Sequence, residues 1–130
     1  MTDSQREAIA RRNDEMANYF AANDMESLKN LYTDDCRVMP EGSETLIGKD
    51  AVPSVFGTLI EGGAAAIKLT TDELGPLGGG GGADDTIFER GHLAISKSDG
   101  SSMGAGKYVV IWKHTSDGYK IYIDIFNNNK

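Results

Sequence analysis

The clearest pattern of apolar positions lies near the C-terminal end, in residues 106–127. Two runs rich in Val, Ile, Tyr and Trp are separated there by the turn Thr-Ser-Asp-Gly at 115–118. An Asp-Gly pair readily adopts the backbone geometry of a tight reversal, so the pattern predicts an antiparallel hairpin. We expect the rest of the chain to pack on this hairpin or to extend its sheet.

Apolar residues at helical spacing predict three helices upstream of the hairpin. The first spans residues 4–23, where Ser4 and Glu7 have the spacing of a capping box. The second is shorter and begins after Asn23-Asp24, with an apolar face formed by Met25, Leu28, Leu31 and Tyr32. The third follows residues 48–50, and its apolar residues recur at i, i+3, i+4, i+7 and i+8: Val52, Val55, Phe56, Leu59 and Ile60.

Alternating polar and apolar residues predict two short strands, 36–39 and 45–47, and two long strands, 66–74 and 84–96. In the second long strand Glu89 lies on the apolar face, together with Ile87, Gly91, Leu93 and Ile95. A run of five glycines at 78–82 precedes that strand. No Lys-Ser/Thr pair and no helix follows the glycines, so we expect a flexible hairpin loop rather than a phosphate-binding loop.

This order of elements separates helices from strands and predicts an α+β fold. We expect one domain over residues 1–130, in which a curved antiparallel sheet wraps around the three N-terminal helices to form a cone. The mouth of such a cone is a natural place for a ligand pocket.

Composition narrows the functional classes. The net charge of −7 disfavours nucleic acid and anionic membranes as partners, because both require clustered Lys and Arg. No apolar run approaches about 20 residues and no signal peptide is visible, so we expect a cytoplasmic protein. One cysteine, Cys36, and two histidines make an internal disulfide impossible and a zinc site improbable, and no cofactor motif is present.

Several runs resemble the nuclear transport factor 2-like superfamily: residues 23–24, 31–35, 39–40, 48–51, 87–91, 106–113 and 117–127. The chain is most similar to the SnoaL-like branch and to the association domain of calcium/calmodulin-dependent protein kinase II. The resemblance implies a cystatin-like, cone-shaped domain that dimerises through the outer face of its sheet. It does not imply one activity, because the superfamily includes isomerases, cyclases, dehydratases, transport adaptors and oligomerisation hubs.

Strand alternation in the final strand places Tyr122, Asp124 and Phe126 on one face and Ile121, Ile123 and Ile125 on the other. We expect the first face to line the pocket and the isoleucine face to be covered by a second subunit. The reverse arrangement, with Asp124 in solvent, is the alternative.

Two carboxylates are the candidates for chemistry. In a partly desolvated cone, Glu89 and Asp124 could have a raised pKa and act as general bases. Tyr32, Tyr108 and Tyr122 could then donate hydrogen bonds to an oxyanion, as in ketosteroid-isomerase-type sites. A buried Asp–Tyr hydrogen bond with only a structural role, and a ligand contact without catalysis, are the alternatives. Asn13, Met39, Phe56 and Phe126 complete the predicted ligand-binding set.

Three functional hypotheses follow. The first is a homodimeric domain that binds a small molecule in an apolar pocket containing acidic residues. The second is an isomerase, cyclase or dehydratase with Asp124 or Glu89 as its base. The third is a module that oligomerises or docks a protein partner.

Overall fold

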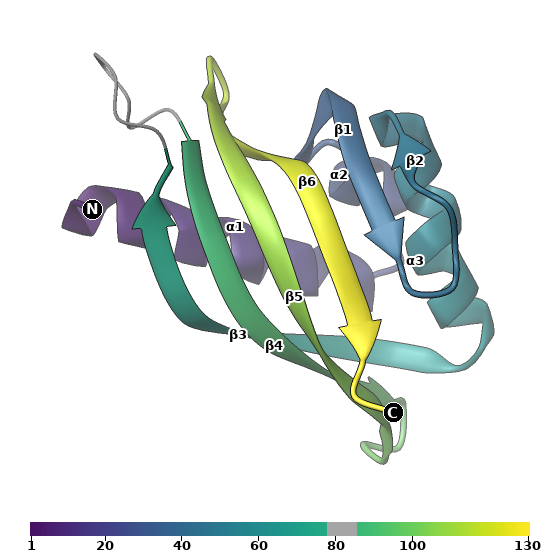
Figure 1. Ribbon diagram of the computed structural model, residues 1–130. Coiled ribbons are helices and arrows are strands. Elements are labelled where there is room, and N and C mark those ends of the chain that lie inside the picture. The colour runs from purple at the N-terminus through teal and green to yellow at the C-terminus, as the bar shows by residue number, and fades with distance from the viewer. Residues whose placement is uncertain (78–85) are drawn as a thin grey trace.

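The computed structural model describes residues 1–77 and 86–130, and the five-glycine run lies outside these residues (Figure 1). The helices are α1 (Asp3–Ala21), α2 (Met25–Lys29) and α3 (Val52–Glu61), and the short 3-10 turn η1 (Lys49–Ala51) leads into the last of them. The strands are β1 (Tyr32–Pro40), β2 (Leu46–Ile47), β3 (Ala64–Pro76), β4 (Thr86–Lys97), β5 (Ser102–Thr115) and β6 (Gly118–Asn128). Within the described residues, no helix is long and apolar enough to cross a membrane.

The six strands form one sheet in the order β2-β1-β6-β5-β4-β3. Strands β3 to β6 are antiparallel neighbours, as the hairpin pattern predicts. Strand β1 adds to β6 in the parallel direction, and β2 pairs with the outer edge of β1. The α+β cone prediction is therefore confirmed, with two more strands in the curved sheet than the four expected.

The second helix is shorter than its apolar pattern suggests. It ends at Lys29, and Tyr32 already belongs to β1. Two long-range interactions hold the chain in the extended conformation here. The backbone N–H of Ile121 donates to the Leu31 carbonyl at 2.9 Å. The Tyr32 hydroxyl donates to Asp124. Tertiary contacts therefore override the helical spacing of Leu31 and Tyr32.

All three helices cover one face of the curved sheet, as Figure 1 shows. The N-terminus of α1 is capped by Thr2, which forms a capping box with Gln5, two residues earlier than the predicted pair of Ser4 and Glu7. Ile9, Met16 and Phe20 form the buried stripe of α1. On the opposite side of this core lie Trp112 and Ile121, each 1% exposed.

A bulge in β6 overturns part of the predicted alternation. Trp112 of β5 pairs with Ile121, but the preceding Ile111 pairs with Ile123, so Tyr122 is an extra residue in the ladder. An extra residue shifts the side-chain alternation by one position. Ile121 therefore joins Asp124 on the inner face and is 1% exposed. Tyr122 is displaced to the outer face, where the Lys113 ammonium lies 3.5 Å from the centre of its ring.

Three rows of inner-face residues cross the sheet and set up the site. One contains Ile87, Trp112, Ile121 and Tyr32. The next contains Glu89, Val110, Asp124 and Val38, and the third contains Gly91, Tyr108, Phe126 and Pro40. Glu89 and Asp124 thus lie in the same row, two strands apart, with their backbones about 10 Å from each other.

Candidate functional site

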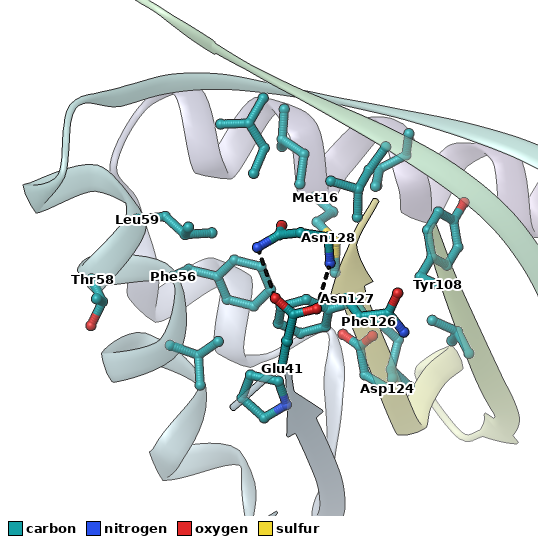
Figure 2. Close-up of a pocket in the computed structure, with 18 of the residues that line it drawn as sticks. Met16, Glu41, Phe56, Thr58, Leu59, Tyr108, Asp124, Phe126, Asn127 and Asn128 are labelled. Carbon is teal, nitrogen blue, oxygen red and sulfur yellow. Dashed lines mark hydrogen bonds between the residues drawn. The ribbon is translucent and has the colours of Figure 1, made fainter. Parts of the chain in front are cut away.

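A pocket of about 430 Å³ lies between the helices and the concave face of the sheet (Figure 2). Its walls are largely apolar: Met16 comes from α1, Phe56 and Leu59 from α3, Leu93 from β4, Val110 from β5 and Phe126 from β6. The rings of Phe56 and Phe126 stack with their centres 6.3 Å apart. Its exposed lining residues mark the mouth and lie in the loop after β1, on α3 and at the end of β6.

Asp124 is the ionisable group inside this pocket. It is 5% exposed, and its Oδ2 accepts a hydrogen bond of 2.6 Å from the Tyr32 hydroxyl. Burial raises the pKa of Asp124 to about 6, with a further increase from the charge of Glu89 and an opposing effect of the Tyr32 hydrogen bond. Burial and the Asp124 charge in turn raise the pKa of Tyr32 well above its ordinary value, so Tyr32 remains a donor.

The second oxygen of Asp124 is open to the pocket. Tyr32 is the described residue that donates to this carboxylate, and it donates to Oδ2. Among the described residues, every side-chain N or O atom that is fully buried has a hydrogen-bond partner. Since Oδ1 has none and Asp124 lines the pocket, Oδ1 must be reached from the cavity. This atom can accept a hydrogen bond or a proton from a bound molecule.

Glu89 is fully buried and lies behind the pocket wall. Its Oε1 accepts hydrogen bonds from Trp112 Nε1 at 3.0 Å and from Asn13 Nδ2 at 3.2 Å. Its Oε2 accepts from Tyr108 Oη at 2.5 Å, Thr71 Oγ1 at 2.8 Å and Asn13 Nδ2 at 3.0 Å. A carboxylate in its ionised form only accepts, and all four partners can donate, so the arrangement fits an anion held by neutral dipoles.

Gly91 makes the bond between Tyr108 and Glu89 possible. A Cβ atom at this position would lie 2.4 Å from the Tyr108 hydroxyl oxygen and 2.4 Å from the Thr70 carbonyl oxygen. The Tyr108 side chain therefore crosses β4 over a residue that has no side chain. The hydroxyl reaches Glu89 while other atoms of Tyr108 face the pocket.

Five of the predicted site residues line the pocket together: Asn13, Phe56, Tyr108, Asp124 and Phe126. Glu89 and Tyr32 lie behind the wall and contact it through hydrogen bonds. Met39 and Tyr122 do not belong to the pocket, and their assignment as ligand-binding residues is corrected. Met39 pairs with Ile125 on the outer face because Val38 occupies the inner position, and Tyr122 is turned outward by the bulge.

The polar mouth was not foreseen from the sequence. Glu41, in the loop after β1, accepts hydrogen bonds from the backbone N of Asn128 at 3.2 Å and from its Nδ2 at 3.1 Å. Figure 2 shows these two contacts among the residues that line the pocket. The position of Glu41 beside the C-terminal strand depends on the parallel pairing of β1 with β6, which no local sequence pattern shows.

Cys36 is a buried core residue, and burial raises the pKa of its thiol to about 11. Among residues 1–77 and 86–130, no group of three or more His, Cys, Asp and Glu side chains is arranged to hold a metal ion.

Known structures resemble this one along nearly the whole chain. A protein from Novosphingobium aromaticivorans, described as nuclear transport factor 2-like with a cystatin-like fold, superposes with a TM-score of 0.80 at 18% identity, covering 98% of this chain and 83% of that one. A ketosteroid isomerase-like protein from Erwinia carotovora atroseptica has a TM-score of 0.76 at 16% identity, covering 99% of both chains. The chain has the nuclear transport factor 2-like fold.

A third structure with the nuclear transport factor 2-like fold, a protein of unknown function from Shewanella oneidensis, has a TM-score of 0.75 at 12% identity and covers 94% of this chain and 98% of its own. No family model matches the sequence. No curated protein matches it either. Since proteins of this fold differ in function, the fold alone does not assign an activity to this chain.

Proposed function

We propose that this nuclear transport factor 2-like domain binds a small, largely apolar molecule in the pocket, with Asp124 as its polar contact. The observation that carries the proposal is the open Oδ1 of Asp124 within walls that are otherwise mainly hydrocarbon. A buried carboxylate that is only half satisfied is unfavourable for stability, so its presence in a cavity points to a ligand. The volume of about 430 Å³ lies in the range of small-molecule sites.

Filling the pocket should abolish binding of an apolar probe. Leu59→Trp adds an indole ring at a lining position of α3 that is only partly buried, so the domain should tolerate it. We expect the affinity for a neutral naphthalene dye to fall at least about tenfold, a loss of about 1.4 kcal/mol in binding free energy. The emission shift of the dye measures its binding. Ile47→Trp adds the same ring to a side chain that is 67% exposed and outside the pocket, and serves as the control. Equal binding by both variants would disprove the pocket as the site.

A second candidate function is proton transfer of the isomerase, cyclase or dehydratase type, within the SnoaL-like branch of the fold. Asp124, rather than Glu89, is the better candidate for the base. Its Oδ1 is open to the cavity, and a pKa of about 6 suits proton abstraction near neutral pH. Glu89 has both oxygens engaged by donors and does not line the pocket. Titration of Asp124 tests this candidate, because an ordinary carboxylate pKa would make it a weak base.

We further propose that the domain forms a homodimer through the outer face of the sheet, which would also serve the association-module hypothesis. Val109 and Ile125 pair across β5 and β6 on this face and are 39% and 41% exposed. Met39 and Ile123 extend the same apolar surface on the neighbouring positions of β1 and β6. Arg90 on β4 and Glu73 on β3 flank this apolar surface and carry opposite charges. A second copy of the chain could therefore provide charges of opposite sign to both residues.

A lysine at Ile125 should dissociate such a dimer. Light scattering on the wild type should give about twice the chain mass of 14.0 kDa, and Ile125→Lys should give the monomer mass, since an apolar interface excludes an unpaired charge. Ile47→Lys introduces the same charge at an exposed position of β2 and should leave the mass unchanged. A wild-type monomer at micromolar concentration would rule out the dimer.

A further inference from the structure

The charged residues in and behind the pocket are all acidic. Asp124 lies inside it, Glu41 lies at its mouth, and Glu89 lies behind Tyr108. None of the described residues that line the pocket is Lys, Arg or His. The Lys107 ammonium near the mouth is turned to the backbone and donates to the Asn128 carbonyl at 3.3 Å. The cavity is therefore negative in potential, with no fixed cation in its wall to receive an anionic ligand.

The pocket also has few free hydrogen-bond donors. The Tyr108 hydroxyl and the Asn13 amide nitrogen both donate to Glu89. Tyr32, behind the wall, donates to Asp124. Near the mouth, the Ser54 hydroxyl donates to the Ala51 carbonyl and the Thr58 hydroxyl to the Ser54 carbonyl. These donors already have acceptors in the protein, whereas Asp124 Oδ1 is an acceptor without a donor. A ligand fits best if it supplies the missing donor.

We propose that the pocket selects a hydrophobic amine, whose protonated nitrogen donates to Asp124 Oδ1 while its hydrocarbon body contacts the apolar walls. This inference rests on the proposed function and assigns the class of ligand for the same site. A charge-assisted hydrogen bond is about twice as strong as a neutral one. The cation also balances two carboxylates that otherwise have only neutral partners. A carboxylate or phosphate ligand would instead meet like charge, with no Lys, Arg or His among the described lining residues to pair with it.

Selectivity for the amine should depend on the ionisation of Asp124. The titratable groups that interact with it are Tyr32 and Cys36 from β1, Glu89 from β4 and Tyr108 from β5. The pKa values of Tyr32, Tyr108 and Cys36 are all raised, so these groups stay neutral where Asp124 titrates. Because the pKa of Asp124 is about 6, the carboxylate is ionised above this pH and the preference for an amine should weaken below it.

Three probes of the same size test the proposal: naphthylmethylamine, naphthylmethanol and naphthoate, measured by calorimetry with the full chain. At about pH 7.5 we expect the amine to bind at least about tenfold more tightly than the alcohol, and naphthoate to bind more weakly than both. At about pH 5 the amine and the alcohol should differ by less than about threefold, because protonated Asp124 no longer pairs with the ammonium. Asp124→Asn should remove the preference at both pH values, and its circular dichroism spectrum shows whether it is folded.

Asp50→Asn removes the same charge from a side chain that is 90% exposed and away from the pocket, and it should keep the amine preference. If the amine binds no more tightly than the alcohol to the wild type, the assignment of ligand class is wrong while the pocket remains. If none of the three probes binds to the folded protein, the proposed function fails as well. If Asp124→Asn does not fold, the amine preference of the wild type at the two pH values still tests the role of Asp124.

Discussion

Replacing Glu89 with alanine should lower the free energy of unfolding by about 4 kcal/mol, and urea denaturation would measure the change. The carboxylate accepts hydrogen bonds from Asn13, Thr71, Tyr108 and Trp112 in a site with no exposed surface. Removal of the acceptor leaves these donors unsatisfied, at about 1–3 kcal/mol for each group that water cannot reach. Water entering the space left by the carboxylate would offset part of the loss, which keeps the expected value below the full sum.

Two further variants separate this effect from the loss of a charge. Glu73→Ala removes a carboxylate that is 54% exposed and bonded to Arg90 at 3.1 Å, and should change stability by less than about 1 kcal/mol. Glu89→Gln keeps the shape but places an amide N–H₂ opposite groups that are themselves donors, so we expect a loss close to that of alanine. If Glu89→Ala were within about 1 kcal/mol of the wild type, the hydrogen-bond cluster would not be a major source of stability.

The elements with the strongest local patterns could be predicted from the sequence. The final hairpin, the buried face of α3 and the inner position of Glu89 all follow from spacing alone, and the structure has each of them. The cap of α1 was misplaced because Thr2 with Gln5 and Ser4 with Glu7 both fit the capping-box pattern. Competing caps two residues apart differ by too little free energy to be separated by local reasoning.

The parts that failed depend on contacts between distant residues. The parallel addition of β1 to β6 is fixed by pairs such as Val38 with Asp124, which no local pattern encodes. The bulge at Tyr122 could not be predicted from the local sequence, because β-branched and aromatic residues simply alternate in this strand. That one extra residue explains why Asp124 and Phe126 were placed correctly on the pocket side while Tyr122 and Ile121 were not.

The hydrogen-bond partners of the two carboxylates are likewise properties of the assembled sheet. Glu89 was predicted on the apolar face of its strand as a candidate base, and its partners there are neutral donors from α1, β3 and β5. For Asp124, the structure shows the buried hydrogen bond with a tyrosine, and the ligand contact stays a prediction. Oδ2 bonds to Tyr32, and Oδ1 is open.

Titration of Asp124 should make the protein less stable as the pH rises from about 4 to about 6. The pKa is 3.8 for an ordinary aspartate and about 6 in the folded protein, so the folded state binds more protons than the unfolded state between these values. Stability falls with rising pH wherever the folded state binds more protons. The difference of about two pKa units corresponds to about 3 kcal/mol, fully developed above about pH 6.

Asp124→Asn should remove this dependence while its side-chain oxygen still accepts the Tyr32 hydrogen bond. The exposed residues Asp24, Asp34 and Asp99 have lowered pKa values and therefore lose stabilising interactions as the pH falls, opposite to Asp124. These three groups are present in both proteins, so subtracting the unfolding free energies of the variant from those of the wild type at each pH isolates Asp124. A flat difference between about pH 4 and 7 would show that Asp124 has an ordinary pKa. Its role as a proton acceptor near neutral pH would then be untenable, because a carboxylate that is already ionised at about pH 4 is too weak a base.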